Sequence, residues 1–234
     1  MKIRKKGAAG RTPEKLLAAA SRVFAKKGYR DATIAEISDR ARANVAAVNY
    51  HFGDKETLYK ESWRHSFSES VKAHPPGGGV SDDAPPEERL RGHVTALLHR
   101  IADKANNEFR IVQKELANPT GLLEEAMNEE LRPLHEAIES IVLELLGLRR
   151  SNQQVQFCVV SIIAQCINPI VATARREENC EGKGGSPVID DIEAYSNHVV
   201  TLSLAGIRTI RDESEKKRSG SKRRRISGKA FTKE

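Results

Sequence analysis

Residues 33–58 read TIAEISDRARANVAAVNYHFGDKETL, and this stretch predicts two short helices joined by a tight turn. Apolar residues recur at helical spacing in both halves: Ile34, Ile37 and Ala41, then Val45, Val48 and Phe52. The break between them falls at residues 42–44. Two brief helices separated by a few residues form the helix-turn-helix pattern, whose second helix reads the major groove of DNA.

Residues that cap helices stand at the expected boundaries. Thr33, with Glu36 three residues later, predicts a capping box at the first helix. Asn44 can accept backbone N–H bonds at the start of the second, and Asp54 can cap the helix that follows. The caps and the apolar spacing therefore agree.

The stretch resembles the N-terminal DNA-binding domain of the TetR family of bacterial transcriptional regulators. The residues that carry the resemblance are Thr33-Ile34, Ile37, Ala41, Asn44, Val48, Tyr50-His51-Phe52, Lys55 and Leu58, preceded by Phe24 and Gly28-Tyr29. Members of the family usually have Gly where this chain has Arg42. If the backbone at Arg42 is left-handed, the non-glycine residue costs about 1 kcal/mol.

Composition favours an all-α fold, with a helix-turn-helix head on a larger helical body. Of the 234 residues, 38% are hydrophobic and only 5% aromatic, which suits helices better than sheet. No apolar run approaches the ~18 residues that cross a bilayer, and the basic N-terminus lacks the apolar segment of a secretory signal. Three cysteines without metal-like spacing suit a reducing cytoplasm. We expect a cytoplasmic protein, nucleoid-associated when bound to DNA, with no metal or cofactor.

The charge is divided along the chain. Residues 1–74 hold 16 Lys and Arg against 8 Asp and Glu, whereas residues 75–211 hold 14 against 20. Residues 212–234 hold 9 against 4. A basic head on an acidic body is typical of a protein whose head alone binds phosphates.

The pattern along the chain predicts six segments. They are a flexible basic arm (1–11), the helix-turn-helix domain (12–54), a connecting helix (55–74), a loop (75–86), a helical effector-binding and dimerisation domain (87–211) and a disordered basic tail (212–234). Pro133 predicts a kink or break in the helix around it. The arm either contacts DNA or is solvated, and the run Lys222-Arg223-Arg224-Arg225 either adds nonspecific DNA affinity or has no role.

The last two predicted helices, 151–178 and 188–211, predict a homodimer. Residues 155–171 are apolar on nearly all sides, so this helix should be buried on all sides. Pairing of both helices with their copies would bury them. The family resemblance implies the same four-helix interface.

The predicted contacts to a double-stranded DNA operator lie around the second short helix. Val45, Ala46 and Ala47 can meet thymine methyl groups, Asn49 can bond an adenine edge, and Arg42 can reach a guanine or a phosphate. Asn44 belongs to the same set as the helix cap. The resemblance implies phosphate contacts for Thr33, Tyr50, His51 and Lys55. The alternative for Tyr50 and His51 is packing within the head.

The resemblance also implies a small effector held in the body, whose binding releases DNA. Polar or soft groups near apolar helix faces are candidates for its site: His93, Phe109, Met127, Cys158, Gln165 and Cys166. Each could instead be ordinary core. A redox role for Cys158 and Cys166 is conceivable, but buried thiols are usually inert. The apolar surroundings favour a hydrophobic or amphipathic effector.

Sequence motifs of enzymes are absent from the chain. No two of the seven histidines are spaced i, i+4, and no G-x-S-x-G or Cys-x-x-Cys occurs. The sequence thus predicts a ligand-responsive repressor that binds a near-palindromic operator as a homodimer; activation remains open. The alternative is a helical interaction protein that binds nucleic acid nonspecifically through its basic ends.

Overall fold

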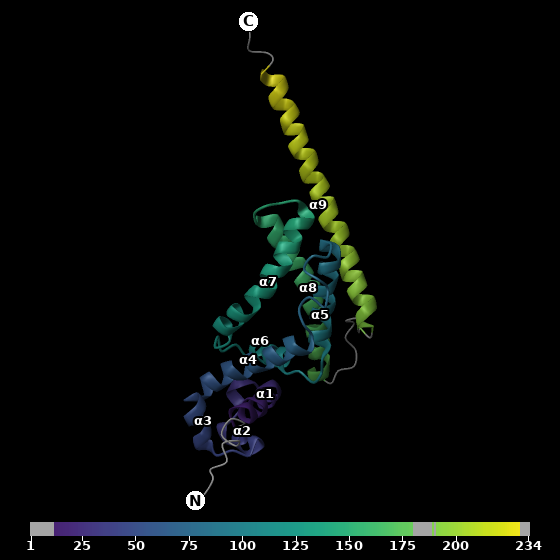
Figure 1. The fold of residues 1–234 in the computed structure, drawn as a ribbon. Helices are drawn as coiled ribbons and strands as arrows, with labels where there is room; N and C mark the ends of the chain where they lie inside the picture. Colours follow the sequence, from purple (N-terminus) through teal and green to yellow (C-terminus); the bar gives the residue numbers. More distant parts are fainter. Residues whose placement is uncertain (1–11, 180–188, 190, 230–234) are drawn as a thin grey trace, which may run out of the picture. The chain divides into compact units, whose positions relative to one another are not determined.

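The computed structural model describes residues 12–179, 189 and 191–229, and over these residues the chain is all-α, as predicted (Figure 1). The helices are α1 (Thr12–Asp31), α2 (Ile34–Ala41), α3 (Val45–Phe52), α4 (Lys55–Ala73), α5 (Pro86–Ala102), α6 (Glu108–Ala117), α7 (Glu124–Leu146), α8 (Gln153–Asn179) and α9 (Ile192–Lys229). No helix in the described part of the chain is long and apolar enough to cross a membrane.

The chain forms two compact units whose limits differ from the predicted domains. Unit 1 comprises Met1–Pro75 and His99–Pro133, and unit 2 comprises Pro76–Leu98 and Leu134–Glu234. The predicted body of residues 87–211 is thus divided, because α6 packs on α1 and α4 of the head. The helix α7 continues through Pro133, and the limit between the units falls directly after this proline.

The core of unit 1 forms where α1, α2, α3 and α4 meet. Its fully buried side chains include Leu16, Phe24, Ile37, Val48, Leu58, Tyr59 and Trp63. The Phe24 ring meets Tyr59 edge-on, with 4.8 Å between ring centroids. Phe52, at the end of α3, is only half-buried.

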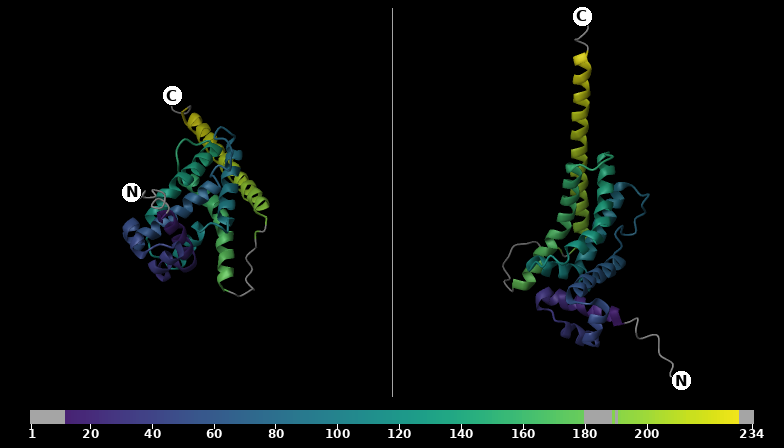
Figure 2. Two further views of the ribbon diagram at one scale, coloured as in Figure 1. Left: turned by 60° about the horizontal axis from the view of Figure 1, so that its bottom comes forward. Right: turned by 90° about the vertical axis from the view of Figure 1, so that its left-hand side faces the viewer.

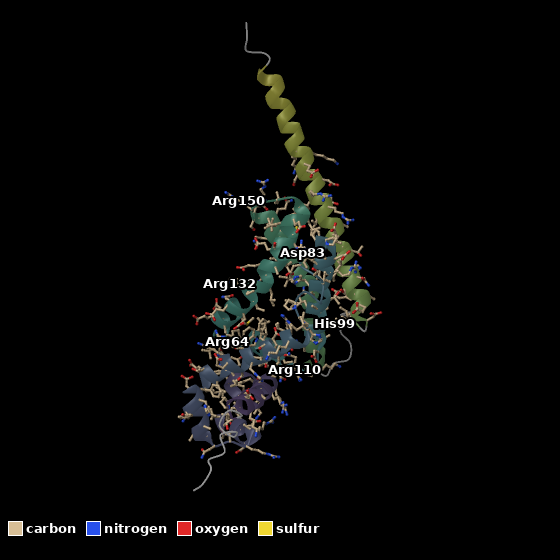
Figure 3. All side chains as sticks on the ribbon, in the orientation of Figure 1. Arg64, Asp83, His99, Arg110, Arg132 and Arg150 are labelled. Carbon is tan, nitrogen blue, oxygen red and sulfur yellow. The ribbon has the colours of Figure 1, made fainter. Side chains whose placement is uncertain are left out.

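Polar contacts explain why α6 and the start of α7 belong to unit 1. The Glu115 carboxylate accepts hydrogen bonds from the Tyr59 hydroxyl at 3.0 Å and from the backbone N–H groups of Thr120 at 2.7 Å and Gly121 at 2.9 Å. Arg64 of α4, labelled in Figure 3, pairs with Glu129 of α7 at 2.5 Å. One carboxylate therefore joins α4 to the turn that follows α6.

In unit 2, α8 packs against α9 (Figure 1, Figure 2). The Tyr195 hydroxyl donates to the Gln165 carbonyl at 2.7 Å, and the Thr95 and Ser196 hydroxyls lie 2.6 Å apart. Buried apolar side chains of α5, α8 and α9 belong to the core of unit 2: Leu90, Val94, Val155, Ile162, Val199 and Ile207.

The end of α9 corrects one prediction. We expected disorder from Asp212, but the helix continues to Lys229. Lys, Arg and Glu are good helix formers, and Glu213 stands four residues before Lys217, a favourable helical pair. The predicted arm 1–11 and residues 180–188 lie outside the described residues.

Candidate nucleic-acid interface

The helices α2 and α3 each begin at a side-chain cap and are joined by a tight turn. Thr33 Oγ1 accepts from the Glu36 N–H at 3.2 Å, and Asn44 Oδ1 accepts from the Ala46 N–H at 2.9 Å. Arg42 has φ 52° and ψ 44°, the left-handed conformation that favours glycine. The Ala43 N–H then closes the turn on the Ser38 carbonyl at 2.9 Å. Both predicted caps are confirmed.

The second half of the predicted capping box takes a different form. The Glu36 carboxylate pairs with Lys27 Nζ at 2.6 Å and with Arg40 at 3.1 Å. The Lys27 hydrogen bond is the main reason why the pKa of Glu36 lies below its usual value. Glu36 therefore ties α2 to α1.

The helix α3 presents most of its surface to solvent. Val45 is 45% exposed and Tyr50 84%, and Ala46, Asn49 and His51 are also exposed. Ala47 is half-exposed, whereas Val48 is fully buried and anchors the helix. Packing of Tyr50 and His51 inside the head does not occur. The candidate base-reading side chains thus share an open face.

Lys55 has a structural role that the sequence did not reveal. Its Nζ donates to the Arg30 carbonyl at 3.3 Å and lies 4.5 Å from the centre of the Tyr29 ring. Burial lowers the pKa of Lys55. Because an ammonium group has three donors, Lys55 can hold the end of α1 and still reach a phosphate. The Gly28-Tyr29 pair in the sequence could have indicated this role of Lys55. Gly28, with φ 74°, interrupts the helical conformation near the end of α1.

Asp54 completes the interface at the start of α4. Its carboxylate accepts from the Thr57 N–H at 2.7 Å, and this backbone hydrogen bond lowers the pKa of Asp54. Gly53, with φ 78°, separates it from α3 and donates its N–H to the Asn49 carbonyl at 3.0 Å. The exposed helix is therefore fixed at both ends.

The candidate effector residues divide between the two units. Phe109 and Met127 are half-buried in unit 1, while His93, Cys158, Gln165 and Cys166 belong to unit 2. Cys158 and Gln165 line a groove of about 350 Å³ between α8 and α9, together with apolar residues such as Ile162, Leu202 and Ile207. Burial raises the pKa of the Cys158 thiol, and that of Cys166 to about 12, which disfavours thiol chemistry. Two of the six residues thus belong to unit 1 and four to unit 2.

Comparison with known families agrees with this geometry. Residues 16–61 match the family described as bacterial regulatory proteins, tetR family. Residues 86–207, which are more than half of the chain, match the C-terminal domain of the HTH-type transcriptional dual regulator CecR. The chain belongs to the TetR family of bacterial transcriptional regulators.

Two individual regulators are similar to this chain over part of their length. The chain is 35% identical to the HTH-type transcriptional repressor NicS of Pseudomonas putida over 101 residues, which are 42% of this chain and 47% of NicS. It is 26% identical to the dual regulator CecR of Shigella flexneri over 144 residues, 57% of this chain and 64% of CecR. Both matches span less than two thirds of the relative.

The fold is similar to nearly the whole of a solved transcriptional regulator. The transcriptional regulator FadR of Bacillus subtilis, solved in complex with stearoyl-CoA, matches with a TM-score of 0.64 at 17% identity. The match covers 82% of this chain and 98% of that one. Family and fold are those of transcriptional regulators rather than enzymes.

Proposed function

We propose that this TetR-family regulator is a sequence-specific repressor that binds a near-palindromic operator as a homodimer. The observation that supports this most strongly is the exposed face of α3 between two capped turns. Val45, Ala46 and Asn49 lie on that face, with Val48 as the buried anchor. A short helix held in this way places small apolar groups and one amide at the edges of bases in the major groove.

Phosphate contacts would fix the register of this helix. Thr33, Arg42, Tyr50 and His51 are exposed around α3, and Lys55 keeps free donors beside it. The excess of basic residues in positions 1–74 supplies the attraction to the phosphate backbone. Sequence preference then comes from the base edges, chiefly from Asn49.

Dimerisation through α8 and α9 is supported by apolar side chains that face solvent on both helices. Phe157 is 61% exposed, Val160 63% and Leu202 54%. Large exposed apolar groups gathered on one surface mark a site of interaction. Because Phe157 and Leu202 also border the groove between α8 and α9, the same two helices of a second copy are the occupant that we propose.

A small hydrophobic or amphipathic effector would release the DNA. Binding must favour the released state, and a change from 1:99 to 99:1 requires about 5.5 kcal/mol of differential affinity. The complex of FadR with stearoyl-CoA supports an effector with a long apolar part. The name of NicS as a repressor supports repression.

Footprinting of the DNA beside the protein's own gene tests the proposal. We expect one protected near-palindrome for the wild type. Leu202→Glu should give a monomer by analytical ultracentrifugation and lose this footprint, whereas Arg149→Glu is a charge control outside α8 and α9. Even, nonspecific coating by the wild type would instead support the helical interaction protein.

A further inference from the structure

Unit 1 buries a polar cluster that DNA recognition does not use. We call it the Arg100 cluster: Trp63 and Phe67 of α4, Arg100 of α5, and Glu108 and Phe109 of α6. Arg100 is 4% exposed and Glu108 only 2%. Burial of two ionisable groups is unfavourable unless their polar atoms are paired.

The pairing within the Arg100 cluster is incomplete. Arg100 Nη2 lies 3.4 Å from Glu108 Oε1, whereas strong ion-paired hydrogen bonds are about 2.7–2.9 Å long. Three buried atoms have no hydrogen-bond partner: Arg100 Nε, Glu108 Oε2 and Trp63 Nε1. Buried polar atoms are nearly always satisfied, so a group of unpaired ones requires an explanation.

The surroundings of Arg100 define which ligand could complete the pairing. The guanidinium carbon lies 5.3 Å from the centre of the Phe67 ring and 5.6 Å from that of Phe109. Trp63 stacks on Phe67 at 5.4 Å, so its indole N–H is an unpaired donor on the same face of α4. The two unpaired donors, Arg100 Nε and Trp63 Nε1, therefore lie beside aromatic rings. A ligand with a hydrogen-bond acceptor group and an apolar part matches these surroundings.

We propose that Arg100 binds the carboxylate of the effector, with the apolar part of that molecule against Phe67 and Phe109. The planar guanidinium can bind a carboxylate through two parallel hydrogen bonds. This inference rests on the effector response proposed above and specifies the chemical class of the effector. It also gives a route to the head, because only Gly53 and Asp54 separate α3 from α4, which carries Phe67.

Glu108 leaves Arg100 when the ligand carboxylate takes its place. Burial raises the pKa of Glu108, while the charge of Arg100 opposes this rise. Once Arg100 is paired with the ligand carboxylate, this opposing effect is weakened and Glu108 takes up a proton from solvent. The site then holds the Arg100 cation, the carboxylate of the ligand and the neutral acid form of Glu108.

Thermal unfolding of the full chain with octanoate and benzoate, each compared with octanol or benzyl alcohol, tests the proposal. We expect each carboxylate to bind the wild type about 10- to 100-fold more tightly than its alcohol, as a hydrogen-bonded charge allows. The double variant Arg100→Met, Glu108→Leu should lose that preference. Replacing both buried charges by apolar groups of similar size usually preserves folding.

A second variant and a DNA titration make the result decisive. Arg100→Lys keeps the charge but loses the paired donors, so the preference should fall by about tenfold. Equal preference in the wild type and the double variant, or no stabilisation of the wild type by either carboxylate, overturns the proposal. Specific DNA binding measured without ligand reports separately on the repressor function, which the double variant should retain.

Discussion

The replacement Arg42→Gly should stabilise the protein. Arg42 is the one non-glycine residue with positive φ in the described part of the chain, at 52°. A side chain at a left-handed position costs about 1–2 kcal/mol, and glycine avoids most of this penalty. Arg42→Ala is the matched control, since it removes the guanidinium but keeps the Cβ atom. In urea unfolding the Gly variant should be about 1 kcal/mol more stable than the Ala variant.

The same pair of variants separates folding from DNA binding. Both lack the guanidinium, so both should bind operator DNA more weakly than the wild type and by the same amount. If Arg42 contacts one phosphate, the salt slope of binding falls by about 0.9 in each. Equal urea stability of the Gly and Ala variants would refute the argument that backbone strain is stored at this turn.

Three further changes test individual contacts. Lys55→Ala should lower the salt slope of DNA binding by about one on every sequence, and a titration at two salt concentrations with no change removes Lys55 as a phosphate contact. Tyr59→Phe deletes the 3.0 Å bond to Glu115 and should lower the free energy of unfolding by about 0.5–1.5 kcal/mol; urea unfolding identical to wild type would contradict it. Burial lowers the pKa of His93 below 6.5 in the folded state. The stability that depends on neutral His93 is therefore complete above about pH 6.5 and is lost as the pH falls through the pKa of the folded state. As the pH is lowered from about one unit above 6.5 to about one unit below it, the wild type should lose more stability than His93→Gln. Urea midpoints of the two proteins that change equally with pH would exclude the effect.

Local features of this fold could be predicted from sequence because they depend on neighbours along the chain. The caps at Thr33, Asn44 and Asp54 each bond a backbone N–H two or three residues away. Residue types and spacing were sufficient for these caps. The left-handed conformation at Arg42 was indicated only by the family resemblance, in which glycine usually occupies this position.

Contacts between distant residues could not be predicted in the same way. Tyr59 meets Glu115 across 56 positions, so the inclusion of α6 in unit 1 is visible only after folding. Nothing in the spacing of Arg100 and Glu108 indicates that both are buried, or that Arg100 lies beside the rings of Phe67 and Phe109. The residue types of the candidate effector residues carry no information on which unit each belongs to, and they lie in both units.

Selection of bound sequences from random DNA by the wild type and by Asn49→Ala tests the central claim most directly. The account predicts a twofold-symmetric motif for the wild type, with half-site centres about 34–36 Å apart or at a related spacing. Asn49→Ala should relax the preference at one position of each half-site and leave the symmetry unchanged. A motif without twofold symmetry, or one that Asn49→Ala leaves identical, would contradict the claim that paired copies of α3 read this DNA.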